Sequence, residues 1–164
     1  MLYKYPYQSE LGIITLLAND HGLLGAWFEN QSKFGGTFDL TRVDEISDTQ
    51  ASPIIKSTVN WLDTYFKGQT PEKLDIQLMP QGTAFQQDVW TQIQEIPYGL
   101  TITTQELTEK VAARQTKGNG TVNSIIGAVK NNPIAIVIPS HRVLIDGDVE
   151  DSKLKSQLRN RELD

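Results

Sequence analysis

A short segment in the C-terminal half of the chain brings together the side chains most able to do chemistry. A continuous apolar run at 134–138 ends at Pro139, and Ser140, His141 and Arg142 follow directly. A hydroxyl beside an imidazole can support nucleophilic or acid–base chemistry. The same polar groups could also cap the end of a strand, although a buried His or Arg needs partners. These residues alone leave a functional site and a polar cap equally open.

The types of site that this segment could form are limited by what the sequence lacks. Ser140 has no surrounding Gly-x-Ser-x-Gly elbow, and adjacent side chains rarely point at one another, so a serine hydrolase is disfavoured. The chain has no cysteine, and its only two histidines are His21 and His141. Disulfides, thiol nucleophiles and three-histidine metal sites are therefore excluded. We expect no metal and no organic cofactor.

Several helices are predicted to position the segment, because apolar residues recur at helical spacing between threonine, glycine and proline boundaries. Two of them are joined by a polar, glycine-containing loop at 115–120, which is typical of a helix-turn-helix but is shared by many small helical domains. The predicted elements are a helix capped by Thr83 and ended by the turn at 97–99, helices at 105–113 and 121–131, a buried strand at 134–138, and a last helix at 153–163.

The N-terminal half has a different pattern. Short apolar or β-branched runs at 12–18 and 25–28, separated by turn residues, predict a β-hairpin or meander. The spacing over 53–67 predicts an amphipathic helix that ends at Gly68. The Pro and Gly residues around Pro80 mark the join, so we predict an α/β protein with domains at 1–79 and 80–164.

Composition supports a folded protein and narrows its partners. The chain has 164 residues, a formal charge of −5, 38% apolar residues and 21% charged ones, which is typical of a globular protein and excludes a simple polycation. Residues 1–80 carry a net charge of −4 and residues 81–164 a net charge of −1. The N-terminus shows no basic, apolar leader, and no run of about 18 apolar residues occurs. We expect a cytoplasmic protein without a membrane partner.

Three motifs together resemble the O6-alkylguanine-DNA alkyltransferases, also called methylated-DNA–protein-cysteine methyltransferases. Residues 82–90 match the pattern Gly-Thr-x-Phe-Gln-x-x-Val-Trp, and residues 96–99 match Ile-Pro-Tyr-Gly. Residues 132–143 match Asn-Pro-x-x-x-x-x-Pro-Cys-His-Arg-Val at every fixed position except the cysteine, which is Ser140. The resemblance covers nearly the whole chain.

This resemblance implies a fold and an activity. Family members have a ribonuclease-H-like N-terminal domain and a winged-helix C-terminal domain, whose helix-turn-helix holds double-stranded DNA. A recognition helix enters the minor groove, and the alkylated guanine is flipped into a pocket. The alkyl group then passes in line to a thiolate made available by the adjacent histidine, once per protein molecule. The expected partner is therefore DNA carrying an alkylated guanine, and we expect a monomer.

The resemblance also implies roles for residues around the segment. Ser140 takes the place of the accepting cysteine, and His141 takes the place of the base. Asn132 would fix the strand end, and Val143 would form part of the pocket wall. Thr104 stands where family members have the tyrosine that helps to rotate the nucleotide.

The expected DNA-contacting residues lie mainly on the helix at 121–131. Gly127 and Ala128 are small enough to allow close approach to the groove, although close packing against another helix would also use small residues. Asn123 stands where the family has the arginine that fills the gap left by the flipped base, and Arg142 is a further candidate. Binding also requires basic side chains on one face. The available ones are Lys110, Arg114, Lys117, Lys130 and Arg142, while Asp146, Asp148, Glu150 and Asp151 would oppose binding.

The departures from the family pattern predict that methyl transfer is lost. A serine hydroxyl is far less acidic than a thiol, whose pKa is near 8.5. Ser140 could be a deliberate substitution or a natural one. Changes at Asn123, at Thr104 and at residues 152–155, which replace a Tyr-x-Gly-Gly segment, favour natural divergence, and no glutamate is assigned to the histidine. The alternative function is a degenerate member that no longer binds DNA and acts as an interaction module or a small-molecule binder.

Overall fold

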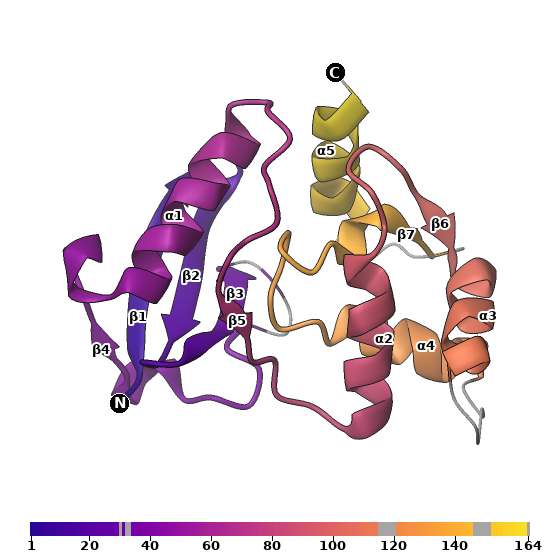
Figure 1. Ribbon diagram of the computed structural model, residues 1–164, viewed down its shortest axis with the longest axis horizontal. Helices are drawn as coiled ribbons and strands as arrows, with labels where there is room; N and C mark the ends of the chain where they lie inside the picture. The colour runs from indigo at the N-terminus through magenta and orange to yellow at the C-terminus, as the bar shows by residue number, and fades with distance from the viewer. Residues whose placement is uncertain (30, 32–33, 115–120, 146–151, 164) are drawn as a thin grey trace. The chain divides into compact units, whose positions relative to one another are not determined.

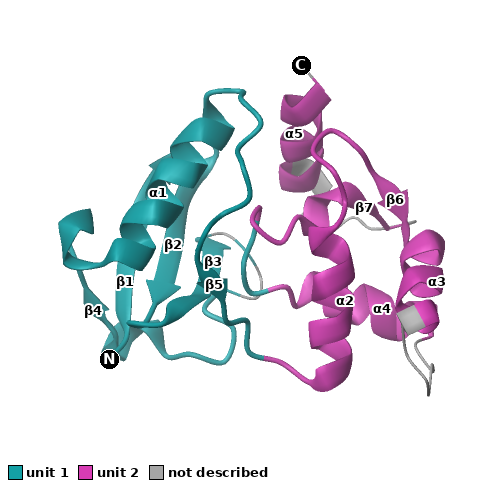
Figure 2. Cartoon of the chain, in the orientation of Figure 1, with its two compact units in different colours: residues 1–81, 133–135 teal, residues 82–132, 136–164 magenta. Residues whose placement is uncertain are grey.

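The computed structural model describes residues 1–29, 31, 34–114, 121–145 and 152–163, without the side chains of residues 114, 152 and 153. The chain divides into two compact units (Figure 2). Unit 1 contains residues 1–81 and 133–135, and unit 2 contains residues 82–132 and 136–164. Among the described helices, none has the length and apolar character needed to cross a membrane.

Unit 1 is built on a five-stranded sheet in the order β4-β1-β2-β3-β5 (Figure 1). β1 (Tyr3–Ser9), β2 (Gly12–Ala18) and β3 (Gly22–Phe28) form an antiparallel meander, which confirms the prediction from the runs at 12–18 and 25–28. The short strands β4 (Asp44–Glu45) and β5 (Gln77–Leu78) pair in parallel with β1 and β3. The short 3-10 helices η1 (Leu40–Arg42) and η2 (Thr49–Ala51) lie between β4 and its neighbouring elements in the chain.

A single α-helix, α1 (Pro53–Phe66), contacts β1, β2 and β3 in this unit (Figure 1). The hydroxyl of Ser52 accepts a hydrogen bond from the Ile55 amide, and proline at the first helical position suits the helix start. The fully buried residues Ile55 and Leu62 lie on the inner face of α1. The predicted helix at 53–67 is therefore confirmed within one residue.

Three residues from the later part of the chain also belong to unit 1. Ile134 forms a parallel bridge with Ala26 of β3. The Ala26 amide donates to the Pro133 carbonyl at 2.8 Å, and the Ala135 amide donates to the Ala26 carbonyl at 2.9 Å. The chain thus enters the sheet of unit 1 for residues 133–135 before it returns to unit 2.

The strand predicted at 134–138 is wrong beyond this single bridge. Ile136 has a backbone φ of +70°, which is strained for a β-branched residue and turns the chain away from an extended path. Ile136 and Ile138 are nevertheless buried. The continuous apolar run at 134–138 correctly predicted that this segment is buried, but not its backbone conformation, because buried turns and buried strands contain the same apolar side chains.

Unit 2 is mainly helical (Figure 1). Its helices α2 (Ala84–Gln94), α3 (Thr104–Arg114) and α4 (Val122–Lys130) contact one another pairwise, and α5 (Ser152–Leu163) contacts η3 (Ser140–Arg142). β6 (Ile102–Thr103) and β7 (Val143–Leu144) form a two-stranded parallel sheet. The four helices predicted for this half are confirmed, including the Thr83 cap, which forms a capping box with Gln86.

Candidate functional site

Ser140 lies at a tight double turn where the apolar run ends. The Ser140 amide donates to the Ile138 carbonyl at 2.8 Å, and the Arg142 amide donates to the Pro139 carbonyl at 2.9 Å. Pro139 has φ −81° and ψ 67°, which is the geometry of an inverse γ-turn. Ser140 is half-buried, while His141 next to it is buried. The turn therefore brings the Ser140 hydroxyl to the boundary between core and solvent.

Asn132 holds this turn from inside the protein. Its side-chain nitrogen Nδ2 donates to the Ile138 carbonyl at 2.6 Å and to the Ser140 Oγ at 3.1 Å. Only 3% of Asn132 is exposed; its hydrogen bond to Ile138 is buried, and its hydrogen bond to Ser140 is partly buried. The amide spans the loop and connects Ser140 to the end of α4.

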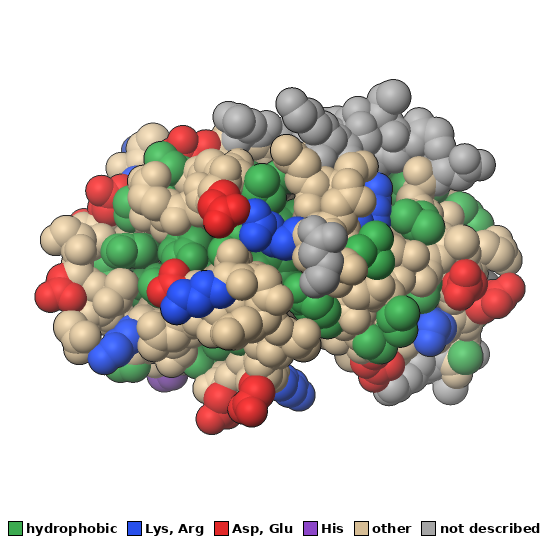
Figure 3. All heavy atoms as spheres, turned by 90° about the horizontal axis from the view of Figure 1, so that it is seen from above, with side chains coloured by type: hydrophobic (Ala, Val, Ile, Leu, Met, Phe, Trp, Pro, Cys, Tyr) green, Lys and Arg blue, Asp and Glu red, His purple; other side chains and the backbone are tan. Residues whose placement is uncertain are grey.

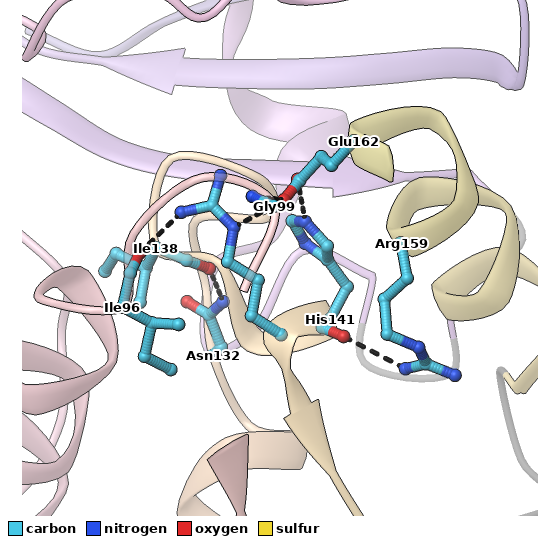
Figure 4. A network of polar contacts seen from close by, with 8 residues as sticks. Ile96, Gly99, Asn132, Ile138, His141, Arg159 and Glu162 are labelled. Carbon is cyan, nitrogen blue, oxygen red and sulfur yellow. Dashed lines mark hydrogen bonds and ion pairs between the residues drawn. The ribbon is translucent and has the colours of Figure 1, made fainter. Parts of the chain in front are cut away.

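His141 points away from solvent and pairs with Glu162 of α5 (Figure 4). Its Nε2 lies 2.5 Å from the Glu162 Oε2, and both side chains are 2% exposed. Burial lowers the pKa of His141, although the hydrogen bond and the charge of Glu162 act in the opposite direction. Burial thus favours the neutral imidazole, and Nε2 is the ring nitrogen that faces the Glu162 carboxylate.

The Glu162 carboxylate also receives two other donors. Arg142 Nε donates to Glu162 Oε1 at 2.8 Å, and the Gly99 amide donates to the same oxygen at 3.1 Å. Arg142 further donates to the Ile96 carbonyl at 2.7 Å, and its guanidinium carbon lies 5.6 Å from the centre of the Tyr98 ring. Glu162 thus connects α5 to the turn at 96–99 and to η3.

Arg142 was expected to contact DNA, and its environment argues against this. The residue is only 8% exposed, and its positive charge is neutralised by a buried carboxylate. A phosphate could reach this guanidinium only if the ion pair with Glu162 were broken, which is costly in a buried site. The structure places Arg142 in a buried polar network with His141 and Glu162, called the supporting network below, rather than on the surface.

Sequence reasoning missed two residues of this network, Glu162 and Arg159. Both lie on α5, three residues apart, and Arg159 donates to the His141 carbonyl at 2.9 Å (Figure 4). The helix itself was predicted at 153–163. No signal in the sequence marks Glu162 as buried, because it is one of several charged residues on this helix.

α4 presents its N-terminal turn to the outside. Thr121 caps the helix by accepting from the Ser124 amide, and Asn123 is exposed. A Cβ added at Gly127 would meet nothing within 4 Å, so close helix packing does not explain this glycine. Ala128 differs, because it is 2% exposed and its carbonyl accepts from Trp90 Nε1 at 2.9 Å. The packing explanation therefore fits Ala128, while Gly127 and Asn123 remain open to an external partner.

Thr104 and Val143 are both buried in unit 2. Thr104 is the first residue of α3, and its carbonyl accepts from the Thr108 hydroxyl at 2.7 Å. Val143 pairs with Ile102 across the small β6–β7 sheet. Both residues lie in the interior of the unit, Thr104 at the start of α3 and Val143 directly after η3.

The structure describes three of the five basic side chains expected to bind phosphate, and one of these three, Arg142, is buried. Lys110 is exposed and Lys130 is half-buried. On the described part of the face in Figure 3, acidic and basic side chains are interspersed with apolar and uncharged ones. Among the described residues, no group of three or more His, Asp or Glu side chains could hold a metal ion. The side chain of Arg114, as well as Lys117, Asp146, Asp148, Glu150 and Asp151, lies outside the described residues.

Comparison with known proteins agrees with this architecture along most of the chain. Residues 1–80 match the model of the 6-O-methylguanine DNA methyltransferase ribonuclease-like domain. Residues 84–161 match the model of the 6-O-methylguanine DNA methyltransferase DNA binding domain. Each unit of the chain thus has its counterpart in one of the two domains.

Individual relatives give the same result. The methylated-DNA–protein-cysteine methyltransferase of Methanosarcina acetivorans is 30% identical over 146 residues, covering 87% of this chain and 83% of the relative. That of Methanosarcina barkeri is 33% identical over 145 residues, covering 87% and 82%. Mycobacterium tuberculosis OGT, solved in complex with DNA, superposes with a TM-score of 0.80 at 25% identity, covering 98% of this chain and 92% of that one. The chain belongs to the 6-O-methylguanine DNA methyltransferase family of DNA alkylation repair proteins, with a DNA-binding domain in its C-terminal half.

Proposed function

We propose that this protein binds double-stranded DNA containing O6-alkylguanine and holds the alkylated base beside Ser140 without accepting its alkyl group. In this proposal, residues 80–164 form the DNA-binding, alkyltransferase-type domain and residues 1–79 form the ribonuclease-H-like domain. The main observation behind this proposal is the position of the Ser140 hydroxyl. Asn132 donates to it, and the next residue, His141, forms a buried pair with Glu162. The supporting network is present around a hydroxyl in place of a thiol.

Alkyl transfer requires a nucleophile that the site does not supply. The acceptor atom must form a bond to the alkyl carbon while the bond from that carbon to the guanine O6 breaks, and it must lose its proton to do so. A thiol ionises near pH 8.5 and a serine hydroxyl is far less acidic. Burial also lowers the pKa of His141, which makes its imidazole a weaker base. Ser140 therefore stays a neutral hydroxyl.

The DNA-binding part of the proposal is supported by the surface of α4. Asn123 and Gly127 present a small, uncharged surface that can approach a groove closely. An asparagine in place of an arginine supports base extrusion less well, and the net charge of −1 over residues 81–164 limits the salt-dependent part of the affinity. We therefore expect lesion binding to be weak and to need low salt.

Binding is tested by fluorescence anisotropy at low salt, with matched duplexes that contain O6-methylguanine or guanine at one position. We expect tighter binding to the O6-methylguanine duplex. Equal and negligible binding to both duplexes would contradict the proposal and support the alternative, in which the fold has lost DNA and serves as an interaction module or a small-molecule binder. A titration at several salt concentrations measures how many phosphate contacts are made.

Methyl transfer is tested separately with a radiolabelled O6-methylguanine duplex. The chain as it stands should take up no label, and label on Ser140 would overturn this part of the proposal. The variant Ser140→Cys should take up at most one methyl group per molecule. Ser57→Cys is the matched control, because Ser57 is exposed on α1 in unit 1 and has no such network. Label on Ser140→Cys but not on Ser57→Cys would show that the sulfur alone was missing, whereas no label on either would show a decayed site.

A further inference from the structure

The hydrogen bonds of Asn132 determine the direction of the hydrogen bond at Ser140. An amide nitrogen carries two hydrogens. One is donated to the Ile138 carbonyl at 2.6 Å and the other to the Ser140 Oγ at 3.1 Å. The Ser140 oxygen therefore accepts in this contact, and its own proton points elsewhere.

The surroundings of Ser140 do not take up this proton. Among the described residues, the hydrogen bond of the Ser140 side chain is the one that it accepts from Asn132, and the Nε2 of the next residue, His141, is engaged by Glu162. Ser140 is half-buried, and its contact with Asn132 is only partly buried. The hydroxyl is thus oriented from inside the protein as a hydrogen-bond donor toward whatever enters the site.

We propose that Ser140 is a specificity-determining residue that donates a hydrogen bond to the alkoxy oxygen of the bound O6-alkylguanine. This inference rests on the proposed function, since it names the contact made by the same site. A thiolate carries no proton and cannot donate, so serine changes the site from a nucleophile to a donor. The donor is already oriented by Asn132, which reduces the entropy lost when the base binds.

Comparing two base analogues in two protein variants distinguishes a hydrogen bond from Ser140 to the base from a purely structural role of Ser140. The protein is titrated with duplexes that contain O6-methylguanine or S6-methyl-6-thioguanine, whose thioether sulfur is a weak acceptor. A neutral hydrogen bond contributes about a 3- to 10-fold change in affinity. We expect the unaltered chain to prefer the oxygen-containing base by that factor and Ser140→Ala to lose the preference.

The variants distinguish the remaining explanations. Ser140→Thr keeps the hydroxyl and should keep the preference for oxygen, while Ser57→Ala, at an exposed position of α1, should change nothing. If Ser140 only supports Asn132, Ser140→Ala weakens binding to both lesion duplexes equally, and the inference is overturned. If Ser140→Ala retains the full preference for oxygen, the inference is overturned while the proposed function stands. If the unaltered chain does not distinguish either lesion from guanine, the proposed function itself fails.

Discussion

Replacing Glu162 with glutamine should destabilise unit 2 far more than any surface substitution. The carboxylate accepts hydrogen bonds from Arg142 Nε at 2.8 Å and from the Gly99 amide at 3.1 Å, and it lies 2.5 Å from His141 Nε2. Glutamine has nearly the same shape, but it has one acceptor oxygen in place of two and no charge. The variant therefore leaves a buried guanidinium without its counter-ion.

The size of the effect follows from burial. The side chains of Arg142 and Glu162 are 10% and 2% exposed, so water cannot replace the lost charge. Removing one partner of a buried ion pair typically costs about 3–5 kcal/mol. The remaining glutamine oxygen can still accept one donor, so we expect about 3 kcal/mol. This is a large part of the roughly 5–15 kcal/mol that stabilises a folded domain.

Urea denaturation and hydrogen exchange measure this effect. With a denaturant slope of about 1.5 kcal/mol/M, a loss of about 3 kcal/mol lowers the midpoint for unit 2 by roughly 2 M. Hydrogen exchange followed by mass spectrometry should show faster exchange in α5 and in residues 140–144. The matched control is Glu109→Gln, because Glu109 is exposed on α3 and accepts only a long contact from Gln105 at 3.4 Å. This control should change stability by less than about 0.5 kcal/mol.

A Glu162→Gln variant within about 1 kcal/mol of the unaltered chain would refute this reasoning. It would mean that the ion pair contributes no more than the cost of desolvating its charges, which is a documented outcome for some buried pairs that are replaced as a unit. Unchanged exchange in α5 would further show that the helix is held by its apolar contacts alone.

Two other predictions follow from the same unit. Gly127→Ala should raise the free energy of unfolding by about 0.5–1 kcal/mol, because an alanine Cβ meets nothing within 4 Å in this helix. The same substitution should weaken lesion binding in the anisotropy assay. Tighter binding would exclude this face of α4 from the DNA interface. His141 should make stability fall in acid: burial lowers its pKa, so below the unfolded value of about 6.5 the unfolded chain binds more protons than the folded chain. The drop in urea midpoint between pH 7.5 and pH 5.5 should be smaller in His141→Gln, and an equal drop in both proteins would show that other groups cause it.

The sequence predicted the helices of this protein well, because each carries local signals. Thr83 and Gln86 form a capping box that depends only on residues three apart. Thr121 caps α4 by accepting from the amide of Ser124, which is also three residues away. The apolar spacing over 53–67 places the apolar side chains on one face of a helix. These signals lie within a few residues of the structure that they specify, so no knowledge of the tertiary fold is needed to read them.

The supporting network was less predictable, because its partners are distant in sequence. Glu162 lies 21 residues beyond His141 and 63 beyond Gly99. On the sequence it is one of several charged residues in a polar helix, and nothing local shows that it is buried. The strand predicted at 134–138 failed for a related reason, since only the bridge with Ala26 and the positive φ of Ile136 decide where extended backbone ends.

The presence of Glu162 does not by itself argue that repair chemistry is retained. Glu162 makes its hydrogen bonds to Arg142 and Gly99 whatever atom stands at position 140, and these contacts connect α5 to the rest of unit 2. A chain that no longer transferred alkyl groups would still need this network in order to fold. The network around His141 is therefore explained by folding alone, and its presence does not decide whether Ser140 supports alkyl transfer. The half-buried Ser140 and the exposed Asn123 lie outside the contacts of Glu162 with Arg142 and Gly99. The effect of changing these two residues on lesion binding is the measurement that decides what this site does.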